Sequence, residues 1–193
     1  MTMLIVGMVI FFGVHLVRVI APDFRAAMMT KMGTWGWKGV YAVVALVGFV
    51  IMVMGYADIR FTSPQLWATD AAWARMAASL LMLPALVLLV ATYVPGVLRA
   101  KVKHPMLIAT ILWAGLHLAV NGRLADLLLF GSFLVWSLLV FYDAAARRPA
   151  VTPPVKSPGL AWDGVAIAIG GFAWWWLAFG GGHLLLFGMP VMR

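Results

Sequence analysis

The chain has 193 residues, of which 65% are hydrophobic and 10% are charged, and its mean hydropathy is +1.02. These values lie far outside the range of soluble domains and predict an integral membrane protein. The absence of cysteine excludes disulfides, cysteine-bound clusters and thiolate catalysis. The net charge of +8 comes from basic residues scattered between apolar segments, so we predict no nucleic-acid partner.

Six apolar segments follow one another along the chain, each long enough for all or most of a membrane-spanning helix. They predict an all-α, polytopic membrane protein with about six transmembrane helices in one bundle, and a single domain over residues 1–193. Pro84 lies inside the third segment and is expected to kink it. The expected spans are residues 3–20, 37–56, 71–93, 106–120, 124–141 and 160–187.

The basic residues are unevenly divided between the two sides of these spans. Four arginines fall on the side of the amino terminus, and the remaining basic residues, from Arg18 to Lys156, fall on the other side. The positive-inside rule therefore places the amino terminus outside the cytoplasm. No Lys or Arg precedes the first span, so we read it as a retained helix rather than a signal peptide. The Pro-rich residues 144–158 are expected to form an extended surface connection.

Four histidines stand out chemically: His15, His104, His117 and His183. A histidine inside a span either packs through hydrogen bonds or binds a cofactor, and imidazoles from facing helices are the usual axial ligands of haem b. His104 and His117 are 13 residues apart, which puts them on different faces at opposite ends of one helix, so they cannot share one iron. If histidines at similar depths in the membrane bind the same iron, His15 pairs with His104 and His117 pairs with His183. This pairing implies two haems.

Several motifs lie near the fourth and fifth spans. They are His-Pro-Met-Leu at 104–107, Leu-Trp-Ala-x-x-His-Leu at 112–118, Asn-Gly at 121–122 and Leu-Phe-Gly-Ser-Phe-Leu-x-Trp at 129–136. With weaker similarity over nearly the whole chain, these motifs resemble the NnrU family, bacterial membrane proteins linked to nitrite and nitric oxide metabolism. That family is in turn related to the plastid 15-cis-zeta-carotene isomerase, a membrane haem protein.

The resemblance implies a haem b whose iron is bound by His15 and His117. By depth these two residues differ by roughly 12 Å along the membrane normal, so the pair requires a haem that lies flat or helices that tilt. A cysteine found in the isomerase near the second histidine is Ala114 here, so no thiolate ligand is expected. The implied location is a bacterial inner membrane, with the amino terminus in the periplasm.

Other polar residues near these histidines have two interpretations each. Arg18, one turn after His15, is expected either to neutralise a haem propionate or to set the topology as a snorkelling side chain. Asn121 either hydrogen-bonds the second ring nitrogen of His117 or makes the turn between two spans. Asp126 and Asp143 lie near the ends of a span and are expected to be solvated.

Two functions of different classes follow. The first is a membrane haem-b protein that serves nitrite and nitric oxide metabolism, as in denitrification, or that isomerises a lipophilic polyene. The alternative is a non-enzymatic assembly factor, channel or scaffold without haem. A transporter is disfavoured because the sequence shows no internal repeat and few charges inside its spans. The expected partners are the lipid bilayer and nitric oxide or a polyene, and self-association is left open.

Overall fold

The computed structural model describes residues 1–69, 71–146 and 159–191, and within these ranges it contains helices and no strand. Five of the described helices are long and apolar enough to cross a bilayer: α1 (Thr2–Ile20), α2 (Pro22–Ile59), α3 (Ala72–Ala91), α6 (Leu124–Ala146) and α7 (Leu160–Ala178). The prediction of an all-α, polytopic membrane protein is confirmed. The expected Pro-rich connection lies, from residue 147 to residue 158, outside the described residues.

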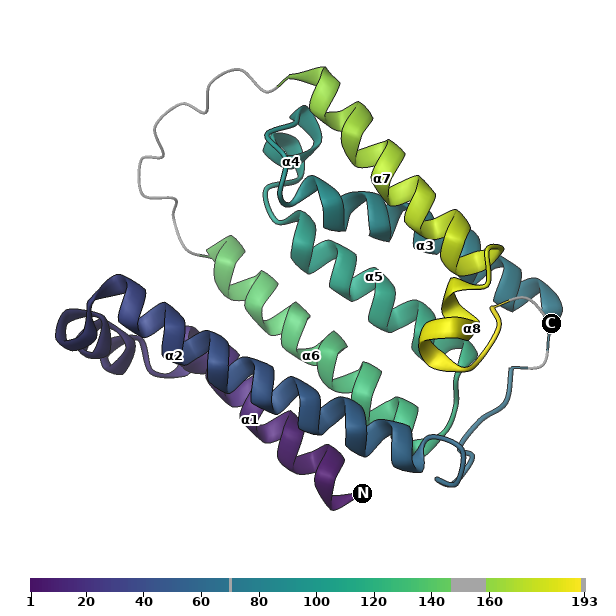
Figure 1. Ribbon diagram of the computed structural model, residues 1–193, viewed down its shortest axis with the longest axis horizontal. Helices are drawn as coiled ribbons and strands as arrows, with labels where there is room; N and C mark the ends of the chain where they lie inside the picture. The colour runs from purple at the N-terminus through teal and green to yellow at the C-terminus, as the bar shows by residue number, and fades with distance from the viewer. Residues whose placement is uncertain (70, 147–158, 192–193) are drawn as a thin grey trace. The chain divides into compact units, whose positions relative to one another are not determined.

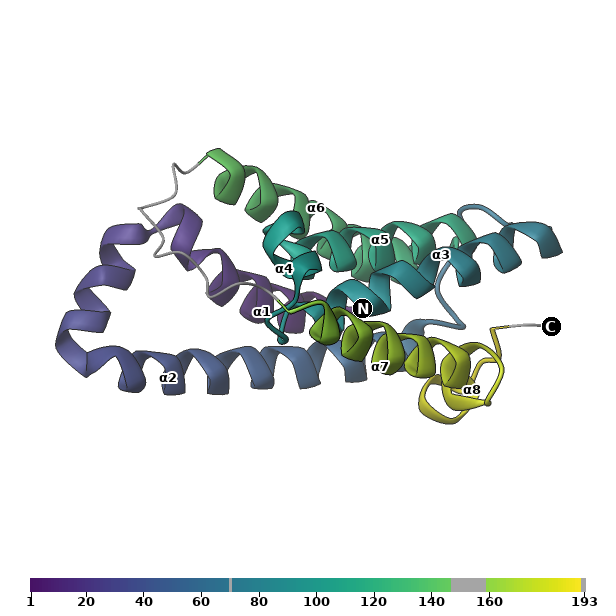
Figure 2. The ribbon, with the colours of Figure 1, turned by 90° about the horizontal axis from the view of Figure 1, so that it is seen from above.

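The second expected span is only the later part of α2, which begins at Pro22 instead of Trp37. Proline is favoured in the first turn of a helix, where its missing N–H leaves no intrahelical bond unmade. The helix is interrupted at Gly33, whose φ of 73° is a conformation that glycine adopts at little cost. Figure 2 shows the earlier part of α2 turned away from the long later part. We call residues 22–32 the arm of α2.

The last expected span, residues 160–187, is wrong in its extent because α7 ends at Ala178. A run of three glycines follows, and Gly181 adopts a φ of 76° that ends the helical path. The chain then forms the short helix α8 (Gly182–Phe187). The apolar character of the whole stretch conceals this break, because glycine lowers hydropathy very little while it strongly disfavours a continuous helix.

The fourth expected span corresponds to α5 (Pro105–Val120), a 16-residue apolar helix that is about 24 Å long. It is shorter than the hydrocarbon core of an average bilayer. Pro84 lies inside α3, which continues as one helix on both sides of it. The basic loop before α5 contains a further short helix, α4 (Val97–Val102).

The chain divides into two compact units. Unit 1 contains residues 1–66 and 123–132, and unit 2 contains residues 67–122 and 133–193, so that α6 contributes to both. In unit 1, α1 and α2 lie side by side along their length (Figure 1). They run antiparallel, because the residues that meet move backwards along α2 as they move forwards along α1.

Small residues hold this hairpin together. A Cβ atom on Gly7 would collide with the backbone of Met52, one on Gly48 with the backbone of Phe11, and one on Gly55 with the backbone of Leu4. Leu4 and Met52 are fully buried. Inside lipid, apolar helices gain no hydrophobic free energy from one another. They associate through van der Waals contacts, which small residues favour because they let the two backbones come close. The hairpin is therefore packed backbone against backbone.

A polar cluster in unit 1 surrounds the first turn of α6. The Asp126 carboxylate accepts hydrogen bonds from the Tyr56 hydroxyl at 2.7 Å and from the Arg123 backbone N–H at 3.0 Å. The Ser63 hydroxyl accepts one from the Ala125 N–H at 3.3 Å. These acceptors satisfy N–H groups that the start of a helix leaves without partners. Asp126 is only 6% exposed, so the expectation that it is solvated is wrong.

In unit 2, α3 packs against both α5 and α7 (Figure 1). A Cβ atom on Gly170 of α7 would collide with the backbone of Val87 in α3. The Trp174 indole also donates a hydrogen bond across this pair to the Ser79 carbonyl, at 2.6 Å. The Asp163 carboxylate accepts one from the Leu98 N–H, at 3.0 Å, which ties α7 to the start of α4.

Candidate functional site

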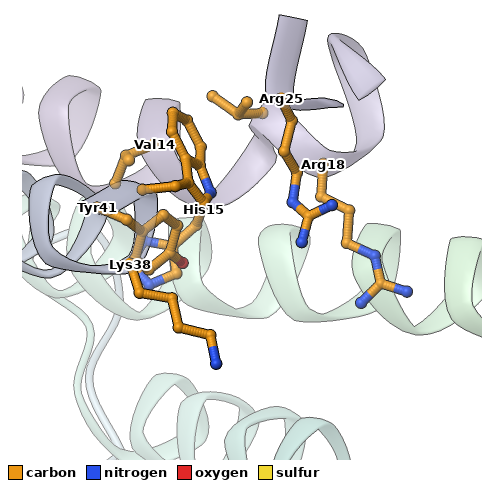
Figure 3. Close-up of a pocket in the computed structure, with 8 residues that line it drawn as sticks. Val14, His15, Arg18, Arg25, Lys38 and Tyr41 are labelled. Atoms are coloured by element: carbon orange, nitrogen blue, oxygen red, sulfur yellow. The ribbon is translucent and has the colours of Figure 1, made fainter. Parts of the chain in front are cut away.

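The strongest candidate site in unit 1 is a pocket at the end of the α1–α2 hairpin where the chain reverses. Its volume is about 230 Å³. Figure 3 shows His15 and Tyr41 together in this pocket, with the side chains of Arg18, Arg25 and Lys38 extending in one direction beside them. The lining residues are Val14, His15, Val17, Arg18, Arg25, Trp37, Lys38 and Tyr41.

His15 is held in this pocket by its own helix and by α2. Its Nδ1 lies 2.6 Å from the Phe11 carbonyl oxygen, one turn earlier on α1. Because that oxygen can only accept, the contact requires the proton on Nδ1 and leaves the lone pair of a neutral ring on Nε2. The ring centre is 4.2 Å from that of Phe11 and 5.2 Å from that of Tyr41. This is the tautomer that binds a metal through Nε2 with a carbonyl as the outer partner.

Three cations from three different segments share the pocket with His15. Arg18 follows it by three residues and therefore lies on the same side of α1. Arg25 comes from the arm of α2, and Lys38 comes from α2 after the interruption at Gly33, with its Nζ 4.9 Å from the centre of the Trp35 ring. None of the described residues that line the pocket carries a carboxylate.

His117 belongs to unit 2, and its ring makes the same kind of local contacts as the ring of His15. Its Nδ1 lies 2.8 Å from the Trp113 carbonyl oxygen, which again places the proton on Nδ1. The ring centre is 5.2 Å from that of Trp113. Ala114, which follows Trp113 in α5, is fully buried. The two predicted ligands therefore present the same tautomer from different units.

Asn121 contacts the backbone near His117. Its Nδ2 donates to the His117 carbonyl oxygen at 2.9 Å, and its own backbone N–H donates to the same oxygen at 2.8 Å. These bonds close the last turn of α5, as expected for a residue that makes the turn between two spans.

The two remaining histidines lie at the ends of elements in unit 2. His104 immediately precedes α5, with its ring centre 5.9 Å from that of Phe141 in α6. It is thus separated from His117 by the length of α5, about 20 Å. His183 lies in α8, where its Nδ1 is 2.6 Å from the Met189 carbonyl oxygen. Among the described residues, no three His, Asp or Glu side chains converge as a metal cluster would require.

The donors of the unit 1 pocket suit one side of a haem. An imidazole with its lone pair on Nε2 is an axial ligand, aromatic rings suit a planar apolar macrocycle, and cations suit its two carboxylates. A volume of about 230 Å³ is less than pockets that enclose a whole ligand usually have. The pocket in unit 1 by itself is therefore large enough for only part of a haem.

Sequence reasoning selected Arg18 but missed Arg25, Lys38 and Tyr41. The two cations were interpreted only as topology signals, because 10 and 23 residues separate them from His15 in the sequence. A signal was nevertheless present: Gly33 and Gly36 lie between them, in a stretch too rich in glycine for one uninterrupted helix.

The apolar helices, their number and the intramembrane histidines define an all-α, multi-pass membrane protein. Within this class, the chain matches the sequence model of the NnrU family, described as NnrU protein, over residues 3–191. The chain therefore belongs to the NnrU family. No match was found among the curated proteins or among the solved structures.

Proposed function

We propose that this chain is a haem-b protein of the bacterial inner membrane that serves nitrite and nitric oxide metabolism. The observation that carries the proposal is the His15 pocket, in which an imidazole of the metal-binding tautomer lies beside three cations. Membership of the NnrU family supports the link to nitric oxide. The resemblance to the carotene isomerase supports a second chemistry for the same haem, the cis–trans isomerisation of a lipophilic polyene.

In this proposal His15 and His117 bind the haem iron, each through Nε2. The Phe11 and Trp113 carbonyls hold the two rings in the required tautomer. Arg18 neutralises a haem carboxylate, and Asn121 supports the turn after His117 through the backbone. Bound haem would supply an iron centre that takes up nitric oxide or exchanges electrons.

The test is the absorption spectrum of the purified full chain, oxidised and reduced, with the haem content measured per chain. We expect one haem per chain, with the reduced bands lost in both His15→Ala and His117→Ala. His104→Ala and His183→Ala are the matched controls and should keep the bands. Two haems per chain, or loss of haem in the control variants, would instead support the pairing of His15 with His104 and His117 with His183.

A non-enzymatic assembly factor, channel or scaffold is the second candidate. The hydrogen bond of each intramembrane histidine to a carbonyl one turn earlier supports it, because this bond also satisfies a histidine that only packs. Two results together would favour this candidate over the haem protein. The wild-type protein would be colourless when haem is supplied, and the His117→Ala variant would be less stable than the wild type.

The proposed topology places the amino terminus in the periplasm and α4 in the cytoplasm. Because the chain has no cysteine, single cysteines can report this directly. In intact cells, a membrane-impermeant thiol reagent that crosses the outer membrane should label Thr2→Cys and leave Lys101→Cys unlabelled. Labelling of Lys101→Cys alone would reverse the topology.

A further inference from the structure

The carboxyl-terminal end of α5 is held by a segment from much earlier in the chain. The Trp67 indole N–H donates a hydrogen bond to the Leu118 carbonyl oxygen at 3.2 Å. The Thr69 hydroxyl donates one to the Ala119 carbonyl oxygen at 2.9 Å. The last carbonyls of a helix have no partner within it, so these bonds satisfy two groups that would otherwise need water. We call residues 67–69, which belong to unit 2 together with α5, the cap segment.

The cap segment also lies very close to the turn that follows α5. The Trp67 backbone N–H donates to the Gly122 carbonyl oxygen at 3.1 Å. A Cβ atom on Gly122 would collide with the Trp67 carbonyl oxygen and with the indole ring, so glycine is what allows this approach. A backbone bond and two side-chain bonds therefore fix the cap segment to the end of the helix.

His117 lies in the last turn of α5, next to the two carbonyls that the cap segment binds. Its own carbonyl oxygen accepts hydrogen bonds from Asn121. Its ring Nδ1 contacts the Trp113 carbonyl oxygen one turn earlier, and this contact requires a helical backbone from Trp113 to His117. Helix ends fray, and their carbonyls need partners from outside the helix. The cap segment therefore supports the turn on which the orientation of the ring depends.

We propose that Trp67 and Thr69 are positioning residues for His117. By holding the last turn of α5 in helical form, they keep the proton of the neutral imidazole on Nδ1 and its lone pair on Nε2. The inference deepens the proposed function, on which it rests for the metal that Nε2 would bind. The cap and the ring tautomer themselves are properties of the chain without haem, so they can be measured separately.

The experiment records the ¹⁵N NMR signals of the histidine rings in the purified full chain, in detergent micelles without haem, at a pH at which the rings are neutral. The shifts of the two ring nitrogens show which one carries the proton. In the wild type we expect His117 to carry it on Nδ1. Thr69→Val and Trp67→Phe each remove one donor and keep most of the side-chain shape, so each should give a His117 signal averaged between the two tautomers.

Amide exchange in the same samples measures how often the last turn of α5 opens. The Asn121 N–H donates to the His117 carbonyl oxygen, so its exchange with deuterium reports this opening. We expect exchange to become about threefold faster in Thr69→Val and in Trp67→Phe, the factor that corresponds to one hydrogen bond between membrane helices. The double variant should exchange about tenfold faster, which is roughly the product of the two factors.

The chain offers matched controls for these variants. Thr110→Val makes the same replacement within α5, where the Thr110 hydroxyl donates to the Met106 carbonyl oxygen one turn earlier, and it should leave the His117 signals unchanged. Thr69→Ser keeps the hydroxyl and should keep the wild-type tautomer and exchange rate. The His15 ring makes the same kind of carbonyl contact in unit 1, so its signals should be unchanged in every variant of the cap segment.

Two results would overturn the inference. If Thr69→Val and Trp67→Phe leave both the tautomer and the exchange rate unchanged, the cap segment does not hold this turn. If Asn121 exchanges faster while the His117 tautomer is unchanged, the cap segment ends α5 without positioning the ring.

Titration with haem b separates this inference from the proposed function. If the wild type binds haem b, its Kd should rise about threefold in Thr69→Val and stay unchanged in Thr69→Ser. If the wild type binds no haem while the cap variants still change the His117 tautomer, the haem proposal fails and the positioning of His117 by the cap segment stands.

Discussion

The α1–α2 hairpin of unit 1 and the α3, α5 and α7 helices of unit 2 are held together in different ways. The hairpin relies on Gly7, Gly48 and Gly55, at which backbone meets backbone. In unit 2, α3 and α7 meet in this way at Gly170, and a hydrogen bond runs from the Trp174 side chain to the backbone of the neighbouring helix. In lipid, where apolar surfaces attract one another weakly, close packing and hydrogen bonding are the two available ways to join helices.

The two regions also surround their histidines differently. His15 and His117 share one ring tautomer and one kind of carbonyl partner, and the pocket described for His15 is also lined by three cations. In unit 1, one pair of helices therefore brings an imidazole and three cations to the same pocket.

The largest expected effect on stability comes from filling a glycine contact in the hairpin. Gly7→Leu places a side chain where the Met52 backbone lies, so the two helices must separate. We expect the free energy of unfolding to fall by about 3 kcal/mol or more. Gly13→Leu, on the same helix, is the matched control, because nothing lies within 4 Å of a Cβ atom there. Denaturation in mixed detergent micelles measures both, and equal losses would show that the hairpin is not packed through Gly7.

A smaller effect is expected from the polar cluster of unit 1. Asp126→Ala leaves the Tyr56 hydroxyl and the Arg123 N–H without their acceptor, in a place from which water is largely excluded. The expected loss is about 1–3 kcal/mol, measured by thermal unfolding in detergent. Tyr56→Phe removes one donor and leaves the carboxylate its bond to Arg123, so it should cost less. A larger loss in Tyr56→Phe than in Asp126→Ala would contradict the central role of Asp126.

The smallest expected effect tests the hydrogen bonds of unit 2. Trp174→Phe removes the 2.6 Å bond to the Ser79 carbonyl and keeps most of the apolar surface. We expect a loss of about 0.6 kcal/mol, the average for hydrogen bonds between membrane helices. Trp175→Phe is the control, because Trp175 is 51% exposed and should tolerate the change. If thermal unfolding shows the same loss for both, α7 is not held to α3 by the Trp174 bond.

Each of the six expected spans overlaps a described helix, five of which are long enough to cross a bilayer, but the sequence predicted the ends of these helices less well. Spans are visible because lipid demands long apolar runs, which leave an unambiguous signal. The ends depend on backbone conformation: the arm of α2 is helical although it carries charged residues, and the break before α8 lies within an apolar stretch. Gly33 and Gly181, with their positive φ angles, decide both.

What the sequence determined by itself is the class of protein, the spans and the set of histidines, because these follow from composition and from residue identity. Tertiary structure alone decided that Asp126 is buried and that Arg25 and Lys38 lie beside His15. The physical reason is that both depend on contacts between residues far apart in the chain. Asp126 accepts a hydrogen bond from Tyr56, and the cations line one pocket because the chain reverses after α1 and α2 is interrupted at Gly33.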